Sequence, residues 1–503
     1  MKTTVVKSSR HELANVCLNV LHQQGRFITM VASDEVERGL DRFVVRYLFA
    51  IEGKTEIVLV ESVIPQDDPT YASVSSWLPS ASWAEREAFD LFGLRALGHP
   101  DLRSLVLHEH WPEGVYPLRK GYAVTQTQPR DVSRAWTYPM VEGEGVFEVP
   151  VGPIHAGVIE PGHFRFQVMG DSVLHAEAKL FYTHRGIEKR SEGMGMTQGL
   201  QLAERICGVC SVSHALSYAQ AIESIAHTEV PRRAKFLRVL LAEMERLYNH
   251  VGDIGNMCAG IGFAYGINHG ARLKEQLMQM QDRIVGHRFL RGSIALGGVA
   301  SDISGEKFTI IKTTMQQVQV QLTEIVEQIL SHDIVIHRFS KTGILSEGVA
   351  RELSVVGPSA RASHCDIDVR RDLPYAAYDE LSFAVPTLEE GDVLARFKQR
   401  YLEAQQSFQL IEQVMKRIPQ GDICVPIGEL PPYSYGIGIT ESARGENVHF
   451  VMIGEGHKID RYRVRSASYA NWPAVPFTIP GNIIPDFPLI NKSFELCYAC
   501  CDR

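Results

Sequence analysis

Two cysteine pairs are the residues of this chain with the clearest capacity for chemistry. The sequence has nine cysteines, and four of them form two C-x-x-C pairs, Cys207 with Cys210 and Cys497 with Cys500. This spacing lets two thiolates reach one ion from a single turn, and four thiolates suit a soft or borderline metal ion. An odd number of cysteines without a signal-peptide pattern favours thiols and metal ligands over disulfides. The sequence therefore predicts a metal site with these four cysteines as ligands.

A structural zinc ion is the simplest occupant, because two C-x-x-C pairs most often indicate zinc. Three features favour another metal. The pairs lie far apart in the sequence, whereas a zinc ribbon usually closes a short loop. The first pair lies in a segment of helical character with Arg205 and His214 close to it. The second lies next to the chain end, which is normally the first part of a chain to fray. Zinc stays open as an alternative at this point.

The residues around both pairs resemble the metal-binding motifs of NiFe-hydrogenase large subunits. The first motif reads Arg205-x-Cys207-Gly208-x-Cys210-x-x-x-His214, and the second, in its arginine-ended form, reads Cys497-x-x-Cys500-x-x-Arg503. The resemblance implies that nickel is held by all four thiolates. It also implies that two of them bridge to an iron carrying CO and cyanide, which gives a NiFe(CO)(CN)2 centre. The iron–sulfur clusters are expected on partner subunits rather than on this chain. The resemblance is also compatible with a Mg or Fe ion near the C-terminus.

Other segments extend the resemblance over nearly the whole chain. Residues 152–155, 160–164 and 469–473 resemble the large subunit of the formate-hydrogenlyase branch, which is energy-converting. Residues 82–93, 99–103 and 117–120 resemble the 30-kDa subunit of respiratory complex I. The resemblance thus implies a complex-I-like domain fused to a hydrogenase large-subunit domain that is related to the 49-kDa subunit.

The same resemblance assigns catalytic roles to three residues. Hydrogen chemistry needs a base that accepts H⁺ beside the metal. Glu188, in an R-G-x-E motif that starts at Arg185, is predicted to shuttle protons to and from a nickel thiolate. Arg444 is expected to hold its guanidinium over the metals as a fixed cation. His214 is expected to hydrogen-bond a bridging thiolate. Without the family context, each would be interpreted as an ordinary ion-pair or structural residue.

Two further residues are predicted to bind the cofactor, and three positions depart from the family pattern. Arg205 and Glu495 flank the two cysteine pairs and are the predicted cofactor-binding residues. The family usually has Asp-Pro before the second pair, where this chain has Glu495-Leu496. Ala443 replaces the usual proline before the active-site arginine. Cys501 is an extra thiol that can be oxidised or bind the metal wrongly. None of these changes removes a ligand.

The elements that must position these residues are of two kinds, strands near the N-terminus and long helices later in the chain. Segments 26–33, 42–51 and 55–61 are rich in Val, Ile, Phe and Tyr and are predicted strands, followed by a short helix at 85–91. Apolar residues spaced three or four apart predict long helices from Pro231 and over 308–332 and 392–417. We expect an α+β fold. A small N-terminal α/β domain (1–125) and a linker (126–149) precede a large, mainly helical domain (150–503) with a central helix bundle.

Bulk properties limit the partners and the location. The formal charge is −8 and the pI is near 6.2, which argues against nucleic acid as a partner. No apolar run is long enough for a membrane span, so we expect a cytoplasmic chain. We expect it to lie on the cytoplasmic face of the inner membrane through partner subunits. The resemblance implies an iron–sulfur small subunit, a ferredoxin-like subunit and antiporter-like membrane subunits, with formate dehydrogenase as a further candidate.

Three functions compete at this stage. The first is the catalytic subunit of a membrane-associated hydrogenase that reduces protons to H₂ reversibly. The second is a complex-I-type NADH/quinone oxidoreductase subunit, a family that generally lacks the four thiolates. The third is a non-catalytic scaffold that holds structural zinc in a membrane complex. The four cysteines favour the first.

Overall fold

The N-terminal region forms a mixed sheet backed by two helices. The computed structural model describes residues 2–132, 136–155 and 159–503. Strand order is β1-β4-β3-β2, with β1 parallel to β4 and the other pairs antiparallel. The strands are β1 (Lys2–Ser8), β2 (Gly25–Asp34), β3 (Arg42–Ile51) and β4 (Glu56–Pro65). Helices α1 (Leu13–His22) and α2 (Ser82–Phe92) pack on this sheet. A short parallel pair joins β5 (Thr70–Ala72) to β6 (Arg95–Leu97).

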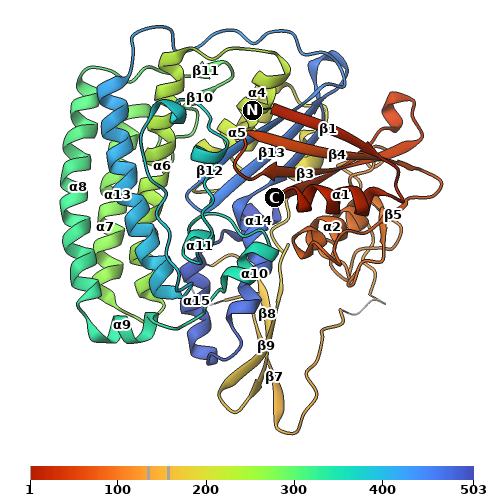
Figure 1. Cartoon of the computed structure of the whole chain (residues 1–503), viewed down its shortest axis with the longest axis horizontal. Helices are drawn as coiled ribbons and strands as arrows, with labels where there is room; N and C mark the ends of the chain where they lie inside the picture. The colour runs from red at the N-terminus through yellow and green to blue at the C-terminus, as the bar shows by residue number, and fades with distance from the viewer. Residues whose placement is uncertain (1, 133–135, 156–158) are drawn as a thin grey trace.

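A long segment without regular structure connects this region to the rest. The described residues between β6 and β7 form neither helix nor strand. An antiparallel three-stranded sheet then extends at the bottom of Figure 1, with β7 (Val146–Val151), β8 (His163–Met169) and β9 (Ser172–Lys179). Residues 133–135 of the predicted linker and 156–158 of the predicted large domain lie outside the described residues. The domain bounds at 125 and 150 stay predictions.

A bundle of four long helices forms one side of the molecule, at the left of Figure 1. They are α6 (Arg232–Ala259), α7 (Ala264–Val285), α8 (Glu306–Leu330) and α13 (Val393–Arg417). The predicted apolar stripes are buried along α6 and α8, and along α13 they are buried except at the partly exposed Tyr401 and Met415. Asp392 caps α13 by accepting a hydrogen bond from the Ala395 amide at 2.7 Å. Gly255 and Gly270 let α6 and α7 approach closely, because a Cβ on Gly255 would lie 2.9 Å from the Gly270 Cα.

The remaining helices are shorter than those of the bundle. Helices α3 (Ile187–Ser191) and α4 (Met196–Ala203) precede the first cysteine pair, and α5 (Ser211–Ile225) follows it. Later in the chain follow α9 (Asp333–Phe339), α10 (Glu347–Glu352), α11 (Pro358–Arg361), α12 (Val369–Asp372), α14 (Ala467–Asn471), α15 (Phe487–Phe494) and α16 (Tyr498–Asp502). A two-stranded hairpin pairs β10 (Ile294–Ala295) with β11 (Gly298–Val299).

A second antiparallel sheet lies between the bundle and the N-terminal region. It consists of β12 (Tyr435–Ser442), β13 (Gly445–Ile453) and β14 (Ile459–Arg465). Helix α5 packs on β12 and β13, and β2 of the N-terminal sheet contacts β13 and β14. Arg465 and Arg461 donate to the carbonyls of Ile28 and Ala32, both at 2.8 Å. The two halves of the chain are therefore joined directly at this sheet.

The α+β fold is confirmed, and the three predicted long helices correspond to α6, α8 and α13. The sequence patterns did not predict the β12–β14 sheet. Its strands are buried on both faces, so they lack the alternation of apolar and polar residues that marks a half-exposed strand. Among the described residues, no helix is long and apolar enough to cross a membrane.

Candidate metal centre

The four predicted thiols meet where the two cysteine pairs face each other. Cys207 lies in the turn between α4 and α5, and Cys210 directly precedes α5. Cys497 directly precedes α16, which contains Cys500. Cys207 is hydrogen-bonded to both Cys497 and Cys500, and Cys500 also interacts electrostatically with Cys210. In the described part of the chain, no group of three His, Cys, Asp or Glu side chains already has metal-ligand geometry.

The surroundings of the second pair oppose the ionisation of its thiols. Hydrogen bonding to Cys207 and burial raise the pKa of Cys497 and of Cys500 well above that of a free thiol. A soft cation binds thiolates, so loading it must release protons. Four thiols brought together from two distant segments are a donor set that fits nickel or another soft metal ion.

Helix α6 holds the first pair in place. Tyr248 Oη and Asn249 Nδ2 both donate to the Val209 carbonyl between the two cysteines, at 2.9 and 2.8 Å. The Glu245 carboxylate accepts hydrogen bonds from the Val212 and Ser213 amides at 2.6 and 2.9 Å. Both amides lie at the start of α5, where no carbonyl of the helix is available to accept a hydrogen bond from them. The turn and the first residues of α5 are thus fixed by one neighbouring helix.

The second pair is held by α14 and by the segment before α3. The Cys497 amide donates to Ser468 Oγ at 3.1 Å, and the Cys500 carbonyl accepts from Ser466 Oγ at 2.8 Å. Asp502 accepts hydrogen bonds from the Thr183 amide and hydroxyl at 3.0 and 2.7 Å. The end of the chain is therefore packed into the interior.

One guanidinium joins the two pairs. Arg185 donates to the carbonyls of Arg205 and Ile206, at 2.9 and 2.7 Å, just before Cys207. It also donates to the Ala499 carbonyl at 2.7 Å, between Cys497 and Cys500. The planar fork of a single arginine thus links the two C-x-x-C segments.

Arg444 lies in the β12–β13 turn with its guanidinium held from several sides. It donates to the Glu495 carbonyl at 2.6 Å and to Asn249 Oδ1 at 2.7 Å, and it lies 3.2 Å from Asp253 Oδ1. Burial alone would lower its pKa, but Asp253, Cys210 and Cys207 raise it well above the usual value. A permanent cation therefore lies beside the first cysteine pair.

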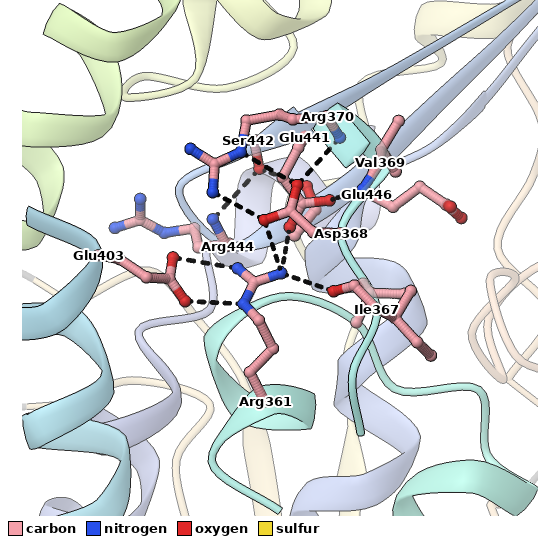
Figure 2. A network of polar contacts seen from close by, with 12 residues as sticks. Arg361, Ile367, Asp368, Val369, Arg370, Glu403, Glu441, Ser442, Arg444 and Glu446 are labelled. Atoms are coloured by element: carbon pink, nitrogen blue, oxygen red, sulfur yellow. Dashed lines mark hydrogen bonds and ion pairs between the residues drawn. The ribbon is translucent and has the colours of Figure 1, made fainter. Parts of the chain in front are cut away.

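A buried network of charges supports this turn (Figure 2). Arg361 pairs with Glu403 at 2.8 Å and with Glu441 at 2.9 Å. Arg246 donates to the carbonyls of Glu441 and Ser442, at 2.6 and 3.1 Å. Because β12 ends at Ser442, the network fixes the strand from which Arg444 extends.

His214 is the second predicted residue at the thiols. Its Nε2 lies 3.3 Å from Cys500 Sγ, and its Nδ1 lies 2.9 Å from His449 Nε2. Burial lowers the pKa of His214 to about 3 and that of His449 well below its usual value, so both rings are neutral. A neutral imidazole at hydrogen-bond distance from a ligand thiol suits an orienting role.

Glu188 lies in a different cluster. Its carboxylate is buried 2.8 Å from Arg461, 3.2 Å from Arg463 and 2.9 Å from Arg503, and it accepts from the Val464 amide at 3.1 Å. Burial would raise its pKa, but the three guanidinium groups lower it. No contact between this carboxylate and a cysteine thiol is present among the described residues.

The carboxylate at the thiols is Glu160, which the sequence motifs did not mark as a site residue. Its Oε2 lies 3.8 Å from Cys497 Sγ and accepts a hydrogen bond from the Ala499 amide at 2.8 Å. Glu160 lies in one of the segments that carried the family resemblance, but a lone carboxylate in a loop has no spacing pattern that indicates a role.

Comparison with known proteins identifies the family. Residues 260–432 and 424–503 match the respiratory-chain NADH dehydrogenase 49 Kd subunit, and residues 5–128 match the 30 Kd subunit. Residues 185–254, which include the first cysteine pair, match nickel-dependent hydrogenase. Formate hydrogenlyase subunit 5 of Escherichia coli (strain K12) is 34% identical over 487 residues, 96% of this chain and 86% of that protein. This chain belongs to the formate-hydrogenlyase family of NiFe-hydrogenase large subunits.

Other relatives include a second hydrogenase subunit and two proteins of other named activities. Hydrogenase-4 component G of the same organism is 34% identical over 93% of this chain and 82% of that protein. An NADH-quinone oxidoreductase subunit of Methylococcus capsulatus (strain ATCC 33009 / NCIMB 11132 / Bath) is 26% identical over 92% of this chain and 86% of that protein. A solved structure of the membrane-bound sulfane sulfur reductase, an archaeal respiratory membrane complex, matches with a TM-score of 0.67 and 28% identity, covering 73% of this chain and 100% of that one. The chain is a hydrogenase large subunit, and the complex-I relationship is more distant.

Two predicted residues of this hydrogenase subunit lie at the edge of the site. The Arg205 side chain is 55% exposed, and it contacts the Gln201 carbonyl and Glu204 rather than a thiol. Glu495 ends α15 with a left-handed φ of 52°, and its backbone carbonyl receives Arg444. Burial raises the pKa of the Glu495 carboxyl to about 7. Their roles in cofactor binding stay predictions.

The Glu87 and Glu188 carboxylates, which lie near the C-terminus, do not fit a Mg or Fe ion. Glu87 and Glu188 are both paired with buried guanidinium groups, and Arg503 itself lies between them. A hard cation needs several oxygen ligands, and these oxygens are already engaged with arginines. The Arg503 guanidinium thus supplies the positive charge at this position.

Proposed function

We propose that Cys207, Cys210, Cys497 and Cys500 hold a nickel–iron centre and that the subunit interconverts protons and H₂ there. The proposal rests on the Arg185 guanidinium, which joins the two cysteine pairs by donating to the Ile206 carbonyl beside Cys207 and to the Ala499 carbonyl between Cys497 and Cys500. The match of residues 185–254 to nickel-dependent hydrogenase supports nickel over zinc. When bound, the centre would supply the site at which protons and electrons combine reversibly to give H₂.

We propose Glu160 as the group that exchanges protons with the thiolates. A general base must lie within hydrogen-bond reach of the proton that it takes. Glu160 contacts Cys497 Sγ, whereas Glu188 is enclosed by three guanidinium groups that favour its ionised form. Glu188 remains the alternative proton carrier, because the R-G-x-E motif indicated it.

Arg444 is proposed to stabilise charge at the site without exchanging protons. Its guanidinium is positioned by Asn249, Asp253 and the Glu495 carbonyl, so it need not reorganise when the charge on the site changes. Its raised pKa keeps it cationic throughout.

We infer that the subunit works in a membrane-associated complex. Its relatives carry the names formate hydrogenlyase subunit 5 and, in Pyrococcus furiosus (strain ATCC 43587 / DSM 3638 / JCM 8422 / Vc1), membrane-bound hydrogenase subunit alpha. The proposed partners are an iron–sulfur small subunit that carries the electrons, a ferredoxin-like subunit, antiporter-like membrane subunits and a formate dehydrogenase. The proposed location is the cytoplasmic face of the inner membrane.

Elemental analysis of the purified subunit tests the metal. We expect nickel and iron at about one atom each per chain, with zinc well below that. A chain that holds one zinc and no nickel would contradict the proposal and would favour the scaffold. A chain with no metal and quinone-dependent activity would favour the complex-I-type function.

A further inference from the structure

A chain of hydrogen bonds leads from Cys500 into the β12–β14 sheet. Cys500 Sγ lies 3.3 Å from His214 Nε2, and His214 Nδ1 lies 2.9 Å from His449 Nε2. His449 Nδ1 lies 2.8 Å from the Tyr462 hydroxyl. All four side chains are buried. Each ring nitrogen therefore has one partner, and the chain ends at a phenol.

Helix packing and strand register bring these groups into line. His214 lies in the first turn of α5, which packs on β13. The register pairs His449 with Val464 and Val451 with Tyr462. His449 and Tyr462 are therefore diagonal neighbours on the same face, a separation that aromatic side chains can span.

The chemistry of the last group sets the direction of every hydrogen bond. A phenol hydroxyl carries one proton, and leaving it unpaired in the interior costs free energy. Among the described residues, His449 is its hydrogen-bond partner, so the hydroxyl donates to Nδ1. A neutral imidazole has one N–H, so His449 carries it on Nε2 and donates to His214 Nδ1. His214 must then carry its proton on Nε2, which faces Cys500.

The opposite direction is disfavoured at the phenol end. It would leave the Tyr462 proton without an acceptor among the described residues. A doubly protonated ring is disfavoured as well, because no described carboxylate hydrogen-bonds either histidine.

We propose that His449 and Tyr462 are positioning residues that fix the tautomer of His214 and direct its Nε2–H at the Cys500 sulfur. The effect on the metal rests on the proposed function, whereas the tautomers follow from the chain of hydrogen bonds alone. An N–H that donates to a ligand sulfur withdraws negative charge from it and so tunes the electron density at the metal.

Nitrogen NMR of the full chain labelled with ¹⁵N-histidine measures the tautomers directly. Ring nitrogens that carry a proton have a different chemical shift from those with a free lone pair. In the metal-free chain, we expect both His214 and His449 to be protonated on Nε2, with signals assigned through His214→Gln and His449→Gln. Tyr462→Phe removes the last donor, so we expect both rings to become tautomer mixtures. A wild-type His214 protonated on Nδ1, or tautomers unchanged in Tyr462→Phe, would overturn the inference.

Tyr218→Phe is the matched control. Tyr218 is a buried tyrosine whose ring lies 5.6 Å from that of Tyr462, but its hydroxyl donates to the Met196 carbonyl. We expect this variant to keep both tautomers and full H₂ turnover. In the nickel-loaded subunit, Tyr462→Phe should lower turnover about 10-fold with unchanged nickel content, the size of effect typical for groups that orient metal ligands.

A conservative variant distinguishes positioning from mere packing. In His449→Gln, the amide oxygen can accept from Tyr462 and the NH₂ can donate to His214, which preserves the direction of the chain. We expect it to retain several-fold more turnover than His449→Leu. Equal turnover in the two variants would contradict the positioning role. Absence of nickel from a wild-type chain with the expected tautomers would instead contradict the proposed metal centre.

Discussion

Replacing single thiols tests whether one site contains both cysteine pairs. Serine is a poor ligand for a soft metal, so Cys207→Ser, Cys210→Ser, Cys497→Ser and Cys500→Ser should each lower bound nickel at least about 10-fold and abolish H₂ turnover. Cys424 is exposed and contacts the Leu296 carbonyl rather than a thiol, so Cys424→Ser is the control. Nickel content and H₂ evolution with a reduced dye are the measurements. Full activity of Cys497→Ser would show that the second pair is not a ligand pair.

Two carboxylates compete for the proton role, and one substitution at each separates them. Glu160→Gln keeps an oxygen that accepts from the Ala499 amide but removes the titratable group. We expect H₂ turnover to fall roughly 10²- to 10⁴-fold with normal nickel content and thermal stability. Glu188→Gln removes one negative charge from among three buried arginines, so we expect it to lower stability. If Glu160→Gln had normal turnover, while Glu188→Gln bound nickel but was inactive, Glu188 would be the residue that exchanges protons with the site.

The sequence predicted those site residues that belong to a spacing pattern. The four cysteines, His214 and Arg444 lie together in the structure, and all belong to short motifs. Glu160, His449 and Tyr462 were missed, because each is a single residue in a loop or strand with no periodicity to mark it. Which of these residues take part in catalysis stays a prediction.

At the scale of elements, Arg185 is the link between the turn before α5 and the turn of α16. Arg185→Lys keeps the charge but loses the planar fork that reaches three carbonyls. We expect nickel affinity to fall about 10- to 100-fold, while circular dichroism shows unchanged helix content. Arg190→Lys, at an exposed position of α3, is the control. Equal nickel affinity in both variants would show that the bridge is dispensable.

Element prediction succeeded where apolar residues gather on one face of a helix. The stripe of α8 repeats every three or four residues because that face alone is buried, whereas α6 is buried on nearly all sides and keeps its stripe because its other faces bury polar and charged residues such as Glu245 and Arg246. Strands β12–β14 are enclosed by α5 on one side and by N-terminal elements on another, so nearly every residue is buried and the period of two disappears. The sheet that positions Arg444 and His449 is thus the element that the sequence least revealed.

At the scale of the whole molecule, a buried ionic cluster joins the N-terminal region to the end of the chain. Glu87 of α2 lies 3.0 Å from Arg503 and also pairs with Arg463. Glu188 pairs with the same two arginines and with Arg461. Local sequence patterns could not predict the cluster, because its members come from four distant segments. Their proximity arises only when β14, α2, α3 and the terminal residues pack together.

The cluster also predicts an acid sensitivity. The arginines lower the pKa of Glu87 and of Glu188 below the usual glutamate value of about 4.5. A carboxyl whose pKa is lowered on folding stabilises the folded state fully above its unfolded pKa and loses that contribution as the pH falls. We therefore expect the free energy of unfolding of the metal-free chain to fall as the pH drops below about 4.5. Urea unfolding across that range measures it, and Glu87→Gln should flatten the dependence.

The pairing of Glu87 with Arg503 further predicts that the N-terminal region helps to keep the metal centre closed. Arg503 lies three residues after Cys500, so releasing its guanidinium should loosen α16 and its thiols. Glu87→Gln leaves Arg463 and Arg503 with one carboxylate fewer, a type of loss that costs about 3–5 kcal/mol in buried pairs. We expect iodoacetamide to label Cys497, Cys500 and Cys501 at least about 10-fold faster in the metal-free variant than in the metal-free wild type, because lowering the free energy of opening by about 1.4 kcal/mol already gives that factor. Mass spectrometry measures the labelling.

Glu85→Gln is the control two residues earlier in α2, since Glu85 is equally buried but hydrogen-bonds Tyr47, Ser73 and Ser75 within the N-terminal region. If both variants labelled at the same rate, the faster reaction would reflect general loss of stability, and the ionic cluster would not hold the thiols closed.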